Sequence, residues 1–182
     1  MASFEGISAT VQEKWGWFFA LGIVFIIGGI FAIAMPLVSS IAVSIFLAAV
    51  LVVAGVVQIW QSFGVKSWTG FIWQLIIGIV MLLGGIAIYT QPATGSFALT
   101  LIIAAVFIAK GVFQIVLSFR LRPMDGWGWI LAAGIIALLA GLMIVSNFPF
   151  SGLWVPGTLA GISLIFTGWS YIALGLAAKR LA

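Results

Sequence analysis

The 182-residue chain contains no cysteine and no histidine, and its acidic residues are only Glu5, Glu13 and Asp125. Without cysteine or histidine, a disulfide framework, thiol chemistry and a nitrogen or sulfur metal site are excluded. The familiar nucleophilic triads need these side chains as well. So few carboxylates also exclude a paired-carboxylate active site or a proton relay inside an apolar domain. We therefore expect no enzyme, no catalytic residue, no cofactor and no metal.

Charge of either sign is scarce, because 5% of the residues are charged and 65% are hydrophobic, with a mean hydropathy of +1.38. A bilayer core about 30 Å thick needs roughly 20 apolar residues per helix. The apolar runs are continuous rather than alternating, which favours helices over barrel strands. Six stretches have the required length: 15–35, 38–60, 70–90, 95–119, 127–147 and 153–178. The sequence predicts an all-α polytopic membrane protein, with one transmembrane domain over 1–182.

The six stretches are organised as three repeats with a period of about 56 residues, marked by Trp17, Trp73 and Trp129. Setting the first copy over the second without a gap gives 19 identities in 47 positions, and the third needs one inserted residue near Phe148. A fixed period of this kind indicates one supersecondary unit used repeatedly. We expect three parallel helical hairpins around a pseudo-threefold axis along the membrane normal. Their approximate ranges are 15–63, 70–119 and 127–178.

Small residues recur seven positions apart on both kinds of helix. This spacing keeps them on one face, where they let neighbouring backbones approach each other. The alternative interpretation is that they line a path for a solute. The glycines predicted to pack helices are Gly22, Gly29, Gly55, Gly78, Gly85, Gly111, Gly134, Gly141 and Gly168.

The basic residues outside the spans all fall on one side of the predicted topology, while the three turns on the other side have none. They are Lys14, Lys66, Arg120, Arg122, Lys179 and Arg180. Basic residues in short loops stay cytoplasmic, so both termini are expected in the cytoplasm. The pI near 10.0 then reflects membrane topology and not nucleic-acid binding. Residues 1–14 are predicted as a short interfacial helix or as a frayed terminus.

Lys110 is the only ionisable side chain deep in a span, apart from tyrosines, and its repeat equivalents are Ala54 and Thr167. An intramembrane charge is a functional candidate by default, and a structural or water-solvated lysine is the alternative. No carboxylate lies in any span to pair with it. The candidate polar site therefore consists of Lys110 with Gln114, Gln58 and Thr167.

The pattern of tryptophan, glycine and proline in each repeat, together with six short-looped spans, resembles the HdeD family of bacterial acid-resistance membrane proteins. The resemblance rests on Trp17, Gly22, Gly28, Gly29 and Pro36, on Trp73, Gly78, Gly84, Gly85 and Pro92, on Trp129, Gly134, Gly141 and Pro149, and on Gly55, Gly111 and Gly168. The third repeat departs from it, with Ala140 in place of the first paired glycine. The resemblance implies a multi-pass protein of the bacterial inner (plasma) membrane, linked to survival under acid stress, and brings no catalytic residues.

Three functions are consistent with the sequence. The first is a non-enzymatic acid-resistance protein that acts as a compact membrane element, or by assembling with itself or with another membrane protein. The second is a small permease or channel for a solute or ion, with Lys110 lining the path. The third is a scaffold subunit of a larger membrane complex. A polar cavity reaching Lys110 would favour transport, and outward-facing apolar surfaces with small residues would favour assembly.

Overall fold

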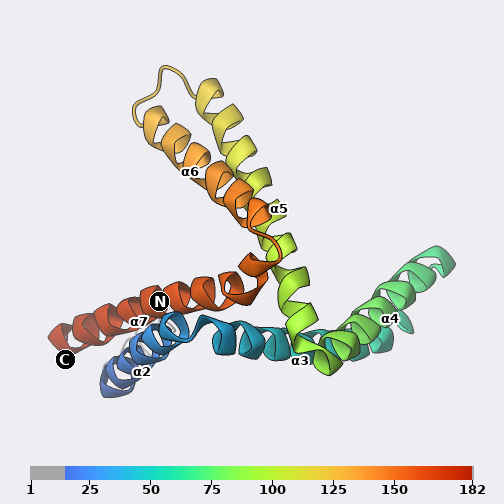
Figure 1. Ribbon diagram of the computed structural model, residues 1–182. Coiled ribbons are helices and arrows are strands. Elements are labelled where there is room, and N and C mark those ends of the chain that lie inside the picture. The colour runs from blue at the N-terminus through green and yellow to red at the C-terminus, as the bar shows by residue number, and fades with distance from the viewer. Residues whose placement is uncertain (1–14, 182) are drawn as a thin grey trace. The chain divides into compact units, whose positions relative to one another are not determined.

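The computed structural model describes residues 15–181, and six α-helices make up most of this range (Figure 1). They are α2 (Trp15–Ala34), α3 (Pro36–Ser62), α4 (Trp68–Thr90), α5 (Pro92–Arg120), α6 (Trp127–Ser146) and α7 (Val155–Leu181), with a 3₁₀ turn, η1 (Phe150–Leu153), before α7. Each α-helix is long and apolar enough to cross a membrane. The predicted all-α fold class with six spans is confirmed. The helix predicted within 1–14 lies outside the described residues.

The helix boundaries follow local residue chemistry. Helices α3 and α5 begin at Pro36 and Pro92, where the missing N–H of proline removes a donor that would have no partner in the helix. Helix α4 is capped by Ser67, whose hydroxyl accepts from the Gly70 N–H at 3.3 Å. Helix α6 follows Gly126, whose φ of 88° is readily adopted only by glycine. Proline, serine and glycine residues at the helix starts therefore set the bounds of the long apolar helices.

The described chain divides into two compact units. One unit combines the chain up to Ser39 with the chain from Gly157 onward, and the other spans Ser40–Pro156. In the first unit α2 packs along α7, and in the second unit α3 packs along α4 and α5 along α6 (Figure 1). Three packed helix pairs therefore carry the six spans.

The packed pairs join different repeats, whereas the sequence predicts hairpins within each repeat. In the first two repeats the reason is the length of the connections. Gln91 alone separates α4 from α5, but residues 63–67 connect α3 to α4 and residues 121–126 connect α5 to α6. Antiparallel helix pairs are ordinarily joined by two or more residues. In the third repeat the connection over 147–154 is longer, yet α6 packs on α5 and α7 packs on α2.

The contact surfaces consist mainly of small residues. Ala48, Ala104 and Ala137 are buried, as are most of the repeated glycines, while most large apolar side chains are exposed. Exposure of leucine, isoleucine and phenylalanine suits a lipid environment, because lipid tails are as apolar as these side chains. The helix pairs are consequently held by close backbone approach.

Candidate functional site

The glycines of α3 and α4 lie where the two backbones come closest. A Cβ atom on Gly55 would lie 2.6 Å from the Leu82 nitrogen and 2.9 Å from the Gly78 oxygen. A Cβ atom on Gly85 would lie 2.8 Å from the Val52 nitrogen. Since backbone atoms cannot move aside as a flexible side chain can, these positions leave no room for a methyl group.

The same geometry recurs in the other two pairs. In α5–α6 a Cβ on Gly111 would lie 2.5 Å from the Leu138 nitrogen, and in α2–α7 a Cβ on Gly22 would lie 2.7 Å from the Gly168 oxygen. By contrast, a Cβ on Gly28 would meet nothing within 4 Å. A backbone atom of the partner helix would lie within 3.0 Å of a Cβ at Gly22, Gly29, Gly55, Gly78, Gly85, Gly111, Gly134, Gly141 and Gly168. The structure thus places every glycine of the predicted packing set at a helix contact.

Buried hydroxyl residues lie near the start of α3 and near the start of α5, and α5 contacts η1. The Ser96 hydroxyl donates to the Gly152 carbonyl, which lies one repeat later in the chain. The Thr100 hydroxyl donates to the Ser96 carbonyl at 2.9 Å, and the Ser44 hydroxyl donates to the Ser40 carbonyl at 2.9 Å. These hydroxyls bond backbone carbonyls, which gives them a structural role.

Two further serines make equivalent hydrogen bonds in the first and third repeats. The Ser39 hydroxyl donates to the Ala32 carbonyl, and the Ser151 hydroxyl donates to the Ile144 carbonyl, each at 2.8 Å. Both bonds span seven residues, and the two serines lie two repeat periods apart. These hydroxyls therefore also bond backbone carbonyls near the helix ends.

Basic side chains near the C-terminal ends of α5 and α7 contact aromatic rings. The Arg122 guanidinium lies 4.0 Å from the centroid of the Trp127 ring and 5.9 Å from that of Phe119. The Lys179 ammonium lies 4.9 Å from the centroid of the Trp15 ring. A cation over an aromatic face is stabilised by about 0.5–1 kcal/mol at an exposed site. Trp127 follows Arg122 by five residues, whereas Trp15 and Lys179 lie on α2 and α7 and are brought together by the packing of these two helices.

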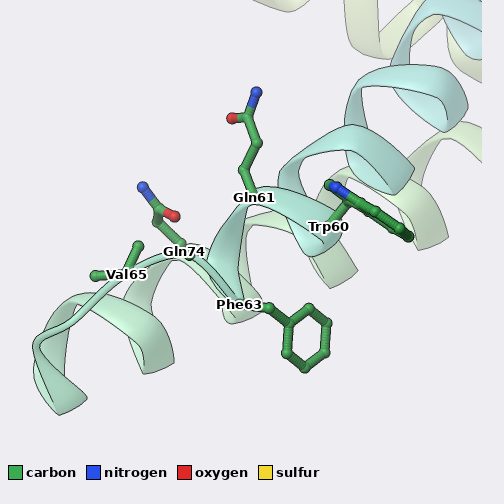
Figure 2. A pocket seen from close by; sticks show the side chains of 6 residues that line it. Trp60, Gln61, Phe63, Val65 and Gln74 are labelled. Carbon is green, nitrogen blue, oxygen red and sulfur yellow. The ribbon is translucent and has the colours of Figure 1, made fainter.

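One cavity lies at the loop end of the α3–α4 pair. It has a volume of about 660 Å³ and is lined by Trp60, Gln61, Phe63, Gly64, Val65 and Gln74. Figure 2 shows the Gln61 and Gln74 amides projecting to one side, with the Phe63 ring turned to the other. The Gln74 Oε1 atom is buried without a hydrogen-bond partner. The cavity mixes amide and aromatic groups and contains no charged side chain.

A second cavity, of about 490 Å³, lies at the loop end of the α5–α6 pair. Its lining is Pro123, Met124, Asp125, Gly126, Trp127, Gly128, Trp129 and Ala132. Lys110 lines neither of these two cavities. Both cavities belong to the connecting loops, and neither is a polar path along the spans.

The four residues of the predicted polar site belong to three different helix pairs. Lys110 is exposed on α5, and Gln114 follows one turn later, half-buried beside α6. Its Cβ would lie 2.9 Å from a Cβ on Gly134, and its Oε1 is buried without a partner. Gln58 is half-buried on α3 and Thr167 on α7. Lys110 and Gln114 are thus one turn apart on α5, while Gln58 and Thr167 belong to the other two helix pairs.

Lys110 is the member of this set that opposes membrane insertion most strongly. A charged side chain near the centre of a spanning helix destabilises insertion by about 2.5–3.5 kcal/mol. Within residues 15–181, no group of three or more acidic, histidine or cysteine side chains comes together. What the geometry offers chemically is one exposed ammonium beside exposed apolar side chains on α5.

Comparison with known proteins gives the family. Residues 20–90 and 76–146 each match the model of the short repeat of unknown function DUF308. The chain is 27% identical over 154 residues to the protein HdeD of Escherichia coli strain K12, and the match covers 82% of this chain and 80% of that protein. The HdeD proteins of Escherichia coli O157:H7 and Shigella flexneri match with the same identity and coverage. No solved structure matches.

The two family matches lie one repeat period apart, and each runs from the first helix of one repeat through the first helix of the next. Each match therefore includes one packed pair, α3–α4 or α5–α6. The six membrane-length helices agree with the predicted multi-pass architecture. The chain thus belongs to the DUF308 family, as an HdeD-like, multi-pass protein of the inner membrane.

Proposed function

We propose that the protein is a non-enzymatic element of acid-stress resistance that keeps its structure and assembly in the inner membrane when the outer side becomes acidic. Its similarity to the HdeD proteins supports this role. The partners of this activity are the lipid bilayer and other membrane proteins or further copies of the chain.

One observation carries the proposal, namely that acid can change almost no charge in this protein. Between about pH 3 and pH 7, aspartate, glutamate and histidine are the side chains that ordinarily change charge. None of the three occurs in α2–α7, or in the connections at Met35, at Gln91 and over 147–154. Asp125 lies in the loop between α5 and α6. A domain built in this way keeps its electrostatic state as the outside is acidified.

The proposal includes an orientation. With both termini in the cytoplasm, the basic loop ends lie inside and the uncharged connections face the acid. The absence of cysteine allows single-cysteine labelling. A membrane-impermeant thiol reagent on intact cells should label Gln91→Cys and leave Gly64→Cys unlabelled. The reverse labelling pattern would show that the orientation is the opposite one. Equal labelling of both sites would contradict a topology that places them on opposite sides of the membrane.

Transport is the alternative that Lys110 raises. Lys110 lines neither described cavity, and its exposed neighbours Val106 and Phe113 on α5 are apolar. A solute path would require hydrated polar groups along several helices. The geometry therefore supports a membrane protein without a hydrated path better than it supports a permease. The scaffold function is one form of the proposed assembly with other membrane proteins.

The test combines survival with flux. Cells lacking the protein should survive exposure to about pH 3 less well than cells expressing it. Liposomes containing the purified protein should show the same proton and solute flux as empty liposomes. Full survival without the protein would contradict the acid-stress role. Flux above empty liposomes that disappears in Lys110→Met would replace the proposal with a permease.

A further inference from the structure

The surface around Lys110 is an exposed face of α5. Helix α6 contacts α5 through Gly111 and Ile108, on the opposite side of the helix. Val106 and Phe113, which lie on the same face as Lys110 by helical spacing, have 57% and 66% of their surface exposed. We call Val106, Lys110 and Phe113 the lysine face. It is apolar apart from one ammonium group.

The lysine face lies at the depth of the bilayer interior. Lys110 precedes Arg120, the last residue of α5, by about 15 Å at 1.5 Å per residue, and it follows Pro92 by about 27 Å. A helical side chain leans toward the N-terminus of its helix, which for Lys110 is away from the nearer end of α5. Snorkelling to the headgroups at the Arg120 end is therefore opposed by both distance and direction.

The described helices supply no anion for this ammonium. The spans contain no carboxylate, and Asp125 lies five residues beyond Arg120 in the loop. A second copy of the chain would bring another Lys110 and still no acid within the membrane. Charge complementarity therefore points to a different protein.

We propose that the lysine face docks a membrane-spanning helix of a different protein that carries an aspartate or glutamate at matching depth. A carboxylate oxygen accepts hydrogen bonds from the Lys110 ammonium, while the exposed Val106 and Phe113 side chains pack against the apolar residues of the incoming helix. This inference rests on the proposed function, in which the protein acts by assembly, and it names the chemistry of the partner.

The test uses the full-length protein in phosphatidylcholine vesicles with labelled synthetic helices. Three apolar membrane-spanning peptides differ only in the central residue, which is glutamate, glutamine or leucine. Energy transfer should show about tenfold tighter association of the glutamate peptide than of the leucine peptide. Lys110→Met should remove this preference, and Lys110→Arg should retain it. Lys66→Met, which removes a cation from a loop, should leave it unchanged.

Several outcomes would overturn the inference. These are equal association of all three peptides, a glutamate preference that survives Lys110→Met, and loss of the preference when phosphatidylglycerol is added to the vesicles. The last outcome would identify a lipid phosphate as the ligand. Circular dichroism of each variant establishes that its helices are intact. Absence of a glutamate preference without solute flux contradicts only this inference, whereas flux that depends on Lys110 contradicts the proposed function.

Discussion

At the scale of single residues, adjacent glycines in one helix have opposite surroundings. In α4, a Cβ on Gly85 would lie 2.8 Å from the Val52 nitrogen and 2.9 Å from the Ala48 oxygen, whereas a Cβ on Gly84 would meet nothing within 4 Å. Alanine favours helix over glycine at either position, so this intrinsic gain is shared by both substitutions. The difference between the two variants therefore measures the helix contact alone.

We predict that Gly85→Ala destabilises the protein by about 1–3 kcal/mol, because the added methyl group forces the α3 and α4 backbones apart. Gly84→Ala should be neutral or slightly stabilising. Unfolding in mixed micelles, followed by circular dichroism, measures both variants under the same conditions. Equal stability of the two variants would show that the close approach of α3 and α4 does not hold the pair together.

The buried hydroxyl of Ser96 provides a second test at this scale. It links α5 to the Gly152 carbonyl of η1, whereas the exposed Ser146 hydroxyl bonds the Met143 carbonyl of its own helix at 3.0 Å. Removing an interhelical hydrogen bond in a membrane costs about 0.6–2 kcal/mol. Ser96→Ala should lose stability in this range in the same unfolding measurement, while Ser146→Ala should not. If Ser146→Ala lost as much stability as Ser96→Ala, the hydrogen bond from Ser96 to Gly152 would make no specific contribution to stability.

At the scale of helices, the pairing of α2 with α7 is the most informative feature, because it joins the two ends of the chain. A Cβ on Gly175 would lie 3.4 Å from the Phe19 Cβ, close to the mean separation of about 3.8 Å in disulfides. A Cβ on Gly16 would meet nothing within 4 Å. The natural absence of cysteine means that an introduced pair has no competitor.

We predict that Phe19→Cys combined with Gly175→Cys forms a disulfide within one chain under mild oxidation. Trypsin cleaves after Lys66 and Arg120, so the two cysteines then lie on separate peptides that only a disulfide holds together. Mass spectrometry should detect this linked pair, and reduction should release it. Gly16→Cys with Gly175→Cys should remain unlinked. Equal linkage of both pairs would indicate random collision rather than a packed pair.

The sequence was sufficient to predict the helices but not their partners. Continuous apolar runs and the prolines at 36 and 92 placed the six spans within a few residues of the observed bounds. The glycine spacing identified the face of each helix that packs, because a seven-residue period keeps one face. It did not say which helix that face meets. The lengths of the connections carry that information for α3 to α5, with Gln91 alone between α4 and α5, but not for the pairing of α2 with α7.

That Lys110, Gln114, Gln58 and Thr167 form one polar site stays a prediction, for a related reason. Lys110 stands out in any reading of the sequence, since it interrupts an apolar helix and breaks the repeat. Its expected companions Gln58 and Thr167 were chosen by repeat equivalence, which does not determine contact. Contact depends on helix pairing, and Gln58 lies on α3 whereas Gln114 lies on α5. The cation–π contact of Arg122 with Trp127 also depends on the path of the loop between them, which the short spacing of the two residues does not determine.

At the scale of the whole molecule, the scarcity of titratable groups has a measurable consequence. By linkage, stability depends on pH only when folding changes the number of bound protons. The spans and their uncharged connections contain no aspartate, glutamate or histidine, and Asp125 is exposed in a loop. An exposed carboxylate contributes little to stability, with interactions of about 0–1 kcal/mol. Acid should therefore change the free energy of unfolding only slightly.

We predict that the free energy of unfolding in detergent changes by less than about 1 kcal/mol between pH 7 and pH 3. Gln58→Glu should abolish this indifference, because it puts a carboxyl group at a half-buried position of α3, with no basic residue within one turn of it along the helix. The neutral form fits this apolar site better than the charged form, so the folded state binds the proton more readily than the unfolded state. The variant should consequently be less stable than the natural protein at pH 7 and should regain stability as the pH falls. Gln61→Glu, at an exposed position of α3, should behave like the natural protein. A natural protein that unfolds at pH 3 would contradict acid indifference, and with it the observation that supports the acid-stress role.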